Sequence, residues 1–283
     1  MGRKPLLVCL LALGLSGCSE GSSAPSGDIV LLPHHLIVEP LIEATYATLA
    51  TESWPEVIII SPDHFHVGAT HISAPPESEF GFTIHRDYAL ATWPGTPVTG
   101  TMIQTNTTEA EVDALVDELA TRDALFIFSI DFSHYLPGDV SYVHDLRSMD
   151  VLAARSVAEA RSLEVDSPIA LEIMLKLLAA RGETLDILRN TNPARDADVM
   201  TFENTTHVFA RSRLLSPDEA PPARAIHTTM FFAHAADWYV GKTQEDRYLY
   251  GYDSVLWNQG GTDHATVTTA GQPDQTFTFN YFE

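Results

Sequence analysis

Short apolar runs bounded by turn-forming residues recur along the chain, and they restrict the fold more than any other feature. The runs are rich in β-branched and aromatic side chains, which is typical of strands buried on both faces. Amphipathic segments lie between them, as expected for a sheet covered by helices. We therefore predict an α/β fold whose strands span residues 28–32, 56–61, 125–130, 184–188 and 207–212.

The amphipathic segments predict helices over residues 39–51, 108–124, 143–160 and 168–181. In the second of these, Thr108 and Glu111 have the spacing of a capping box. The last is opened by Pro168, a residue favoured in the first turn of a helix.

The first eighteen residues have the character of a secretory signal. Arg3 and Lys4 precede an apolar stretch that is too short to cross a membrane as a helix. The stretch ends in Leu-Ser-Gly-Cys, which looks like a bacterial lipobox with Cys18 as the lipid-modified residue. We expect a signal peptide over residues 1–17 and an exported protein anchored in the membrane by its lipid. Cys9 would leave with the signal, so no disulfide is expected.

Changes in composition divide the rest of the chain into a tether, a domain, a linker and an appendage. Residues 18–27 are small and polar, as in a flexible tether, and residues 28–214 hold the predicted α/β domain. Residues 215–225 are rich in proline and acids and predict a linker to an appendage over 226–283. The net charge of −22 argues against nucleic acid as a partner. A small-molecule substrate is expected, of unknown identity.

Histidines follow three of the predicted strands. His34 and His35 follow the first strand, and the second is followed by Asp63, His64 and His66. After the third strand the sequence reads "DFSHY". Loops at the carboxyl ends of parallel strands converge on ligands, so these side chains predict a common site.

Imidazole and carboxylate groups at such a site indicate a metal centre. Two histidines and one carboxylate form the facial set of non-heme iron enzymes. Asp166 offers the carboxylate, but Asp166 or Ser167 could instead cap the helix that begins at Pro168. We leave both readings open.

The third motif has two readings as well. Asp131 could fix the tautomer of His134 and make it a general acid or base, or it could accept backbone N–H groups in a turn. Asp63 is a candidate for orienting His64 or His66. His207 could join the pocket, although a satisfied histidine near the core is the simpler reading.

Other chemistries have less support in the sequence. It contains no GxSxG, Walker or GxGxxG motif. Cys18 would be the single thiol of the mature chain, so a cysteine nucleophile is excluded. A zinc hydrolase remains an alternative, because the same histidines and aspartate could bind zinc and activate water.

The three motifs "PHHL", "IIISPDHFHVG" and "FIFSIDFSHY" resemble, in order, those of the Memo family, also called AmmeMemoRadiSam system protein B. The resemblance covers about residues 28–213. It implies the three-layer α/β/α fold, with a mainly parallel sheet, that Memo proteins share with the LigB-like class III extradiol dioxygenases. The family's Glu-His-Ser motif finds no equivalent in the sequence.

Carried across by motif, the resemblance implies His34, His64 and Asp166 as ligands of one metal ion. It also implies His134 as the acid/base residue. From the residues themselves, we expect Asp131 to line the pocket beside His134, and His35, Asp63, His66 and His207 to lie in or around the pocket. Iron or copper is favoured as the ion, and zinc is possible. The expected function is a metal-binding protein with dioxygenase-like oxidoreductase chemistry. The alternatives are a cell-surface metal binder without turnover and a metal-dependent hydrolase.

Overall fold

The computed structural model describes residues 26–136, 138–196, 204–215, 226–231, 261–269 and 275–281. The predicted signal peptide, Cys18, most of the tether and residues 216–225 of the linker lie outside these ranges.

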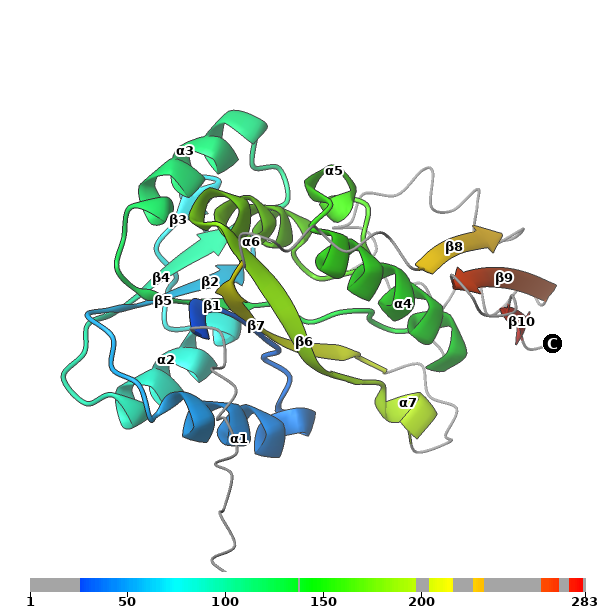
Figure 1. The fold of residues 1–283 in the computed structure, drawn as a ribbon, viewed down its shortest axis with the longest axis horizontal. Coiled ribbons are helices and arrows are strands. Elements are labelled where there is room, and N and C mark those ends of the chain that lie inside the picture. Colours follow the sequence, from blue (N-terminus) through cyan, green and yellow to red (C-terminus); the bar gives the residue numbers. More distant parts are fainter. Residues whose placement is uncertain are drawn as a thin grey trace, which may run out of the picture.

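Seven strands form the main sheet, in the order β3-β4-β2-β5-β1-β7-β6 (Figure 1). Neighbours among the four central strands, β4, β2, β5 and β1, run parallel, whereas β3, β7 and β6 pair antiparallel with their neighbours. The strands are β1 (Ser26–Leu32), β2 (Val57–Pro62), β3 (Ile72–Ser73), β4 (Val98–Ile103), β5 (Leu125–Ser129), β6 (Glu183–Thr191) and β7 (His207–Leu214). The predicted α/β class is therefore confirmed, with a mixed sheet.

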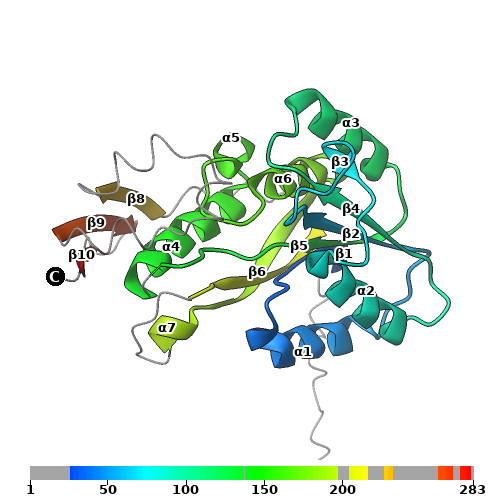
Figure 2. The ribbon, with the colours of Figure 1, turned by 180° about the vertical axis from the view of Figure 1, so that it is seen from behind.

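Helices pack on both faces of this sheet. Figures 1 and 2 show α1 and α2 along one face and α3 and α6 along the other. The helices are α1 (Glu39–Leu49), α2 (Phe80–Thr92), α3 (Glu109–Ala120), α4 (Gly138–Ala154), α5 (Val157–Ala160), α6 (Pro168–Arg181) and α7 (Pro193–Asp196), with a 3-10 turn η1 (Leu36–Val38) before α1. The capping box of α3 is present, since Thr108 accepts from Glu111 N and the Glu111 side chain accepts from Thr108 N.

The core has two halves because successive strand residues point to opposite faces. In β1, Ile29 and Leu31 pack with α3 and α6, whereas Val30 and Leu32 pack with α1 and α2. All four side chains are fully buried. The near-continuous apolar sequence of β1 is thus explained by a covered sheet.

The predicted helix over residues 143–160 needs correction, and several elements were not predicted. The range 143–160 holds two helices, because Arg155 adopts a left-handed φ of 53° between α4 and α5. The elements α2, β3, β4 and α7 were not predicted from the sequence. In β4 the side chain of Thr99 is exposed and Gly100 interrupts the apolar run, so its strand pattern is weak.

The described part of the appendage is a second sheet. Its strands β8 (Ile226–Phe231), β9 (Gly261–Thr269) and β10 (Gln275–Tyr281) pair antiparallel in the order β10-β9-β8. Within the described residues, no helix combines the length and apolar character needed to span a bilayer.

Candidate metal centre

The side chains of His34, His64 and Asp166 meet at the carboxyl ends of the parallel strands. Each offers one ligand atom, and these three atoms lie within 4.8 Å of one another. His34 follows β1, His64 follows β2, and Asp166 precedes α6. Because β1, β5 and β2 run parallel, their ends share one edge of the sheet.

Asp166 is not the cap of α6. Ser167 is the N-cap, and its hydroxyl accepts a hydrogen bond from Ala170 N at 3.3 Å. The Asp166 carboxylate is turned instead toward the histidines, with Oδ2 3.2 Å from His34 Nε2 and 3.8 Å from His64 Nε2. Ser167 therefore caps α6, and the Asp166 carboxylate lies with the two histidines.

Glu79 orients the ring of His64. Its Oε1 atom lies 2.6 Å from His64 Nδ1, and its Oε2 accepts the His64 backbone N–H at 3.1 Å. Glu79 is buried and also caps α2 by accepting from Gly81 N. A carboxylate on Nδ1 favours the tautomer whose Nε2 lone pair is available to a metal.

Ser129 orients the ring of His34 in the same way, through its Nδ1 atom. Its Oγ lies 3.0 Å from His34 Nδ1 and donates to the carbonyl oxygen of Gly81 at 2.7 Å. Since the hydroxyl proton is used in that bond, the oxygen accepts the Nδ1–H of His34. Neutral His34 therefore carries its lone pair on Nε2, the atom that faces Asp166.

The electrostatics of the cluster favour a cation. Burial alone would lower the pKa of His34, but the carboxylates of Asp131, Asp166 and Glu79 raise it to about 9. In addition, the buried Oδ1 of Asp166 accepts no hydrogen bond from any described residue. A donor set of two oriented imidazoles and a carboxylate with an unused oxygen fits a divalent metal ion.

Asp131 holds the backbone of the first motif. Its Oδ1 accepts His34 N at 3.0 Å, and its Oδ2 lies 3.3 Å from His34 Nε2. Its own backbone N–H donates to Asp166 Oδ2 at 3.2 Å. Burial opposes its charge, yet the surrounding histidines, His34 foremost, lower its pKa. Asp131 therefore lies beside the ligand set and helps to position it.

Backbone pairing between the segment after β5 and the start of β7 brings His134 and His207 to the edge of the sheet that holds the cluster. Phe132 N donates to Thr206 O, and Thr206 N donates to Ser133 O, so the segment after β5 runs alongside the start of β7. Burial lowers the pKa of both histidines, that of His207 to about 4.

The two histidines of the first motif, His34 and His35, have different neighbours. His34 joins the ligand cluster, whereas His35 Nδ1 lies 3.2 Å from His207 Nε2. His207 Nδ1 in turn lies 2.8 Å from Thr191 Oγ1. His207 is fully buried and both of its ring nitrogens have a polar partner, as expected for a satisfied histidine near the core, and one of these partners is His35.

Asp63 and His66 lie in the loop after β2 but outside the cluster. The Asp63 carboxylate accepts from Val67 N, Gly68 N and the Gln104 side chain, and so it holds the loop rather than the His64 ring. His66 is exposed and has a left-handed φ of 51°.

Phe80 closes one side of the site. Its ring stacks on His64 with centroids 4.1 Å apart and meets His34 edge-on at 5.3 Å. Phe80, Glu79 and Ser129 were not predicted from the sequence. A possible signal for Ser129 was its place at the end of a buried strand, but nothing local to Glu79 and Phe80 indicated the site.

Comparison of the chain with models of known protein families gives no match, and comparison with curated proteins gives none either.

Proposed function

We propose that this protein is an exported, lipid-anchored, Memo-like protein with a three-layer α/β/α domain that binds one metal ion through His34, His64 and Asp166. The observation that carries the proposal is the meeting of these three ligand atoms within 4.8 Å. The hydrogen bonds of Ser129 and Glu79 support it, because they leave the Nε2 atoms of both histidines for the metal.

Iron or copper suits the site best, and zinc is compatible with it. Two imidazoles and a carboxylate are the usual set for non-heme iron, whereas relative affinity among divalent ions favours copper. Such an ion supplies Lewis-acid and redox chemistry to a bound substrate. We infer oxidoreductase chemistry of the dioxygenase type.

The protein's own residues would prepare the substrate. Phe80 shields the imidazoles from water on one side. His134 is neutral at pH 7 because burial lowers its pKa, so a ring nitrogen can accept a proton. Asp131 keeps the His34 backbone in place.

Metal capture without turnover is a second candidate. It is favoured by the burial of the ligand side chains, which are 2%, 3% and 0% exposed for His34, His64 and Asp166. Such an enclosed set holds an ion well but restricts the access of a substrate.

One set of measurements separates these functions. The purified protein is loaded with iron, copper or zinc, its metal content is measured, and oxygen consumption is followed with catechol-type substrates. Bound iron or copper with oxygen uptake supports the oxidoreductase, whereas tight binding without turnover supports capture. Bound zinc with ester or amide hydrolysis would favour the hydrolase.

The matched variants are His64→Ala and His71→Ala. His71 is a partly exposed histidine that pairs with Glu111. We expect His64→Ala to lose stoichiometric metal and His71→Ala to keep it. Full occupancy in His64→Ala would exclude the proposed centre.

A further inference from the structure

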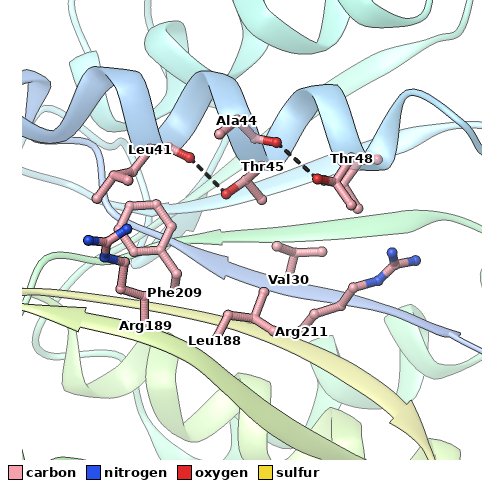
Figure 3. A pocket seen from close by; sticks show the side chains of 10 residues that line it. Val30, Leu41, Ala44, Thr45, Thr48, Leu188, Arg189, Phe209 and Arg211 are labelled. Atoms are coloured by element: carbon pink, nitrogen blue, oxygen red, sulfur yellow. Dashed lines mark hydrogen bonds between the residues drawn. The ribbon is translucent and has the colours of Figure 1, made fainter.

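A groove of about 250 Å³ lies between α1 and the outer strands β6 and β7 (Figure 3). Its base is apolar, because Val30, Leu49 and Phe209 line it and are buried. Leu188 of β6 lines it too and is 58% exposed. None of the proposed metal ligands contributes to the groove, so it is a separate feature of the fold.

The hydroxyl groups in the groove are already engaged. Thr45 donates to Leu41 O at 2.9 Å, and Thr48 donates to Ala44 O at 3.0 Å, both within α1. Figure 3 shows both bonds along the helix. The polar groups left to recognise a ligand are therefore the arginines.

Arg189 and Arg211 line opposite ends of the groove in Figure 3. Arg211 forms an ion pair with Glu52 at 2.8 Å. The Arg189 side chain forms no ion pair, hydrogen bond or ring contact with any described residue.

That lack of a partner distinguishes Arg189 within the described ranges. Each other arginine there, and Lys176, contacts an acid, a carbonyl oxygen, a hydroxyl group or an aromatic ring. The chain has 38 acidic residues against 16 basic ones. In a protein with so many acids, an arginine without an acidic partner beside an apolar groove marks a place for an external anion.

We propose that this groove binds a small amphiphilic monocarboxylate, an aliphatic chain that ends in one carboxylate. The apolar base would bury the chain, and the Arg189 guanidinium would bind the carboxylate through its two parallel N–H groups. The volume is below the common range of about 300–1,000 Å³ for ligand pockets, which favours a short chain.

Octanoate is the probe. 1-Octanol serves as a control of equal chain length without the charge, and butyrate as a control with the charge and a shorter chain. Binding to the full chain is measured by calorimetry. Octanoate binds at least about fivefold more tightly than either control, a ratio typical of one partly exposed ion pair or a few buried methylenes. Equal affinity for octanoate and 1-octanol would exclude recognition of the charge.

Two variants locate the site. Arg189→Gln weakens octanoate binding about fivefold, whereas Arg213→Gln, which removes a partly exposed arginine of β7 paired with Asp186, leaves it unchanged. Leu188→Asp abolishes binding through charge repulsion, and Leu214→Asp, at an exposed strand leucine outside the groove, does not. The proposal is overturned if Arg189→Gln leaves the octanoate affinity unchanged. It is also overturned if Arg213→Gln or Leu214→Asp loses as much octanoate affinity as the groove variant with which it is paired.

The groove is tested independently of the metal centre. His64→Ala, which is expected to lose metal, retains the octanoate affinity of the parent chain. If octanoate binding disappeared with the metal, the carboxylate would be bound at the metal centre and the groove assignment would be wrong.

Discussion

Glu79 holds both the ring and the backbone of His64. One carboxylate oxygen lies 2.6 Å from the ring nitrogen Nδ1, and the other accepts the backbone N–H at 3.1 Å. A residue at the start of α2 therefore sets the direction of His64, the proposed metal ligand that follows β2.

The contact between Glu79 and His64 can be tested by removing the charge of the carboxylate. Glu79→Gln keeps an oxygen for Nδ1 and for Gly81 N, but it loses the negative charge that raises the basicity of the imidazole. It also places an NH2 group where Oε2 accepts the His64 backbone N–H. We expect metal affinity to fall about 10- to 100-fold, the usual effect of losing such a partner. Titration against a competing chelator measures it.

The control for this prediction is Glu111→Gln, which changes the partner of the outlying His71. Its metal affinity is expected to equal that of the parent. An equal affinity in Glu79→Gln would mean that the carboxylate has no effect on the centre.

Asp166 and Ser167 are neighbours with separable roles. Asp166→Asn removes a ligand charge, so metal is lost while the cap of α6 remains. Ser167→Ala removes the cap and lowers the free energy of unfolding by about 1 kcal/mol, with metal retained. Metal analysis and urea unfolding of both variants test this separation, and the reverse pattern would restore Asp166 as the cap.

Asp145 gives a pH dependence of stability. Its carboxylate is fully buried, and burial raises its pKa to about 7 despite hydrogen bonds from Thr206, Asn190 and Ser133. Between pH of about 4 and about 7 the folded state holds a proton that the unfolded state has lost. The contribution of Asp145 to stability therefore falls as pH rises through this window and is constant above it.

Asp145→Asn removes this titration. The free energy of unfolding of the variant minus that of the parent is expected to be larger at pH of about 7.5 than at pH of about 5. Urea unfolding at both pH values checks the sign. Asp186→Asn, at an acid exposed on β6, should lack this gain, and a difference between Asp145→Asn and the parent that stays constant with pH would contradict the assignment.

Gly100 is required by close packing. A Cβ atom there would lie 2.4 Å from the Phe82 ring and 2.6 Å from the Pro75 side chain. We expect Gly100→Ala to lower the free energy of unfolding by about 1–3 kcal/mol, as in other overpacked sites. Thr99→Ala, at the exposed neighbouring position, should cost much less. A variant Gly100→Ala as stable as the parent would mean that Phe82 moves aside freely.

The strand ends could be predicted because their signal is local. A buried apolar run followed by histidine defines β1 with His34 and β2 with His64, and the rule for parallel sheets brings the two loops together. Asp166 was harder, because aspartate and serine both cap helices. Only the three-dimensional direction of its carboxylate resolves the choice.

The contact of Glu79 with His64 could not be predicted in the same way. The two residues are 15 positions apart and are joined by an irregular loop with the two-residue strand β3. Their contact depends on where α2 packs against the sheet. The groove at Arg189 could not be predicted for a similar reason, since α1 lies far from β6 and β7 in the chain and lines the groove together with them.

The ligand set also has a consequence for the order of assembly. His34 and His64 come from the first half of the α/β domain, and Asp166 arrives only with α6. The three atoms become neighbours after β1 and β2 have both aligned beside β5 and α6 has docked on the sheet. A nascent chain therefore presents at most part of the centre before α6 is made, so capture of the ion would report that β1, β2, β5 and α6 have come together.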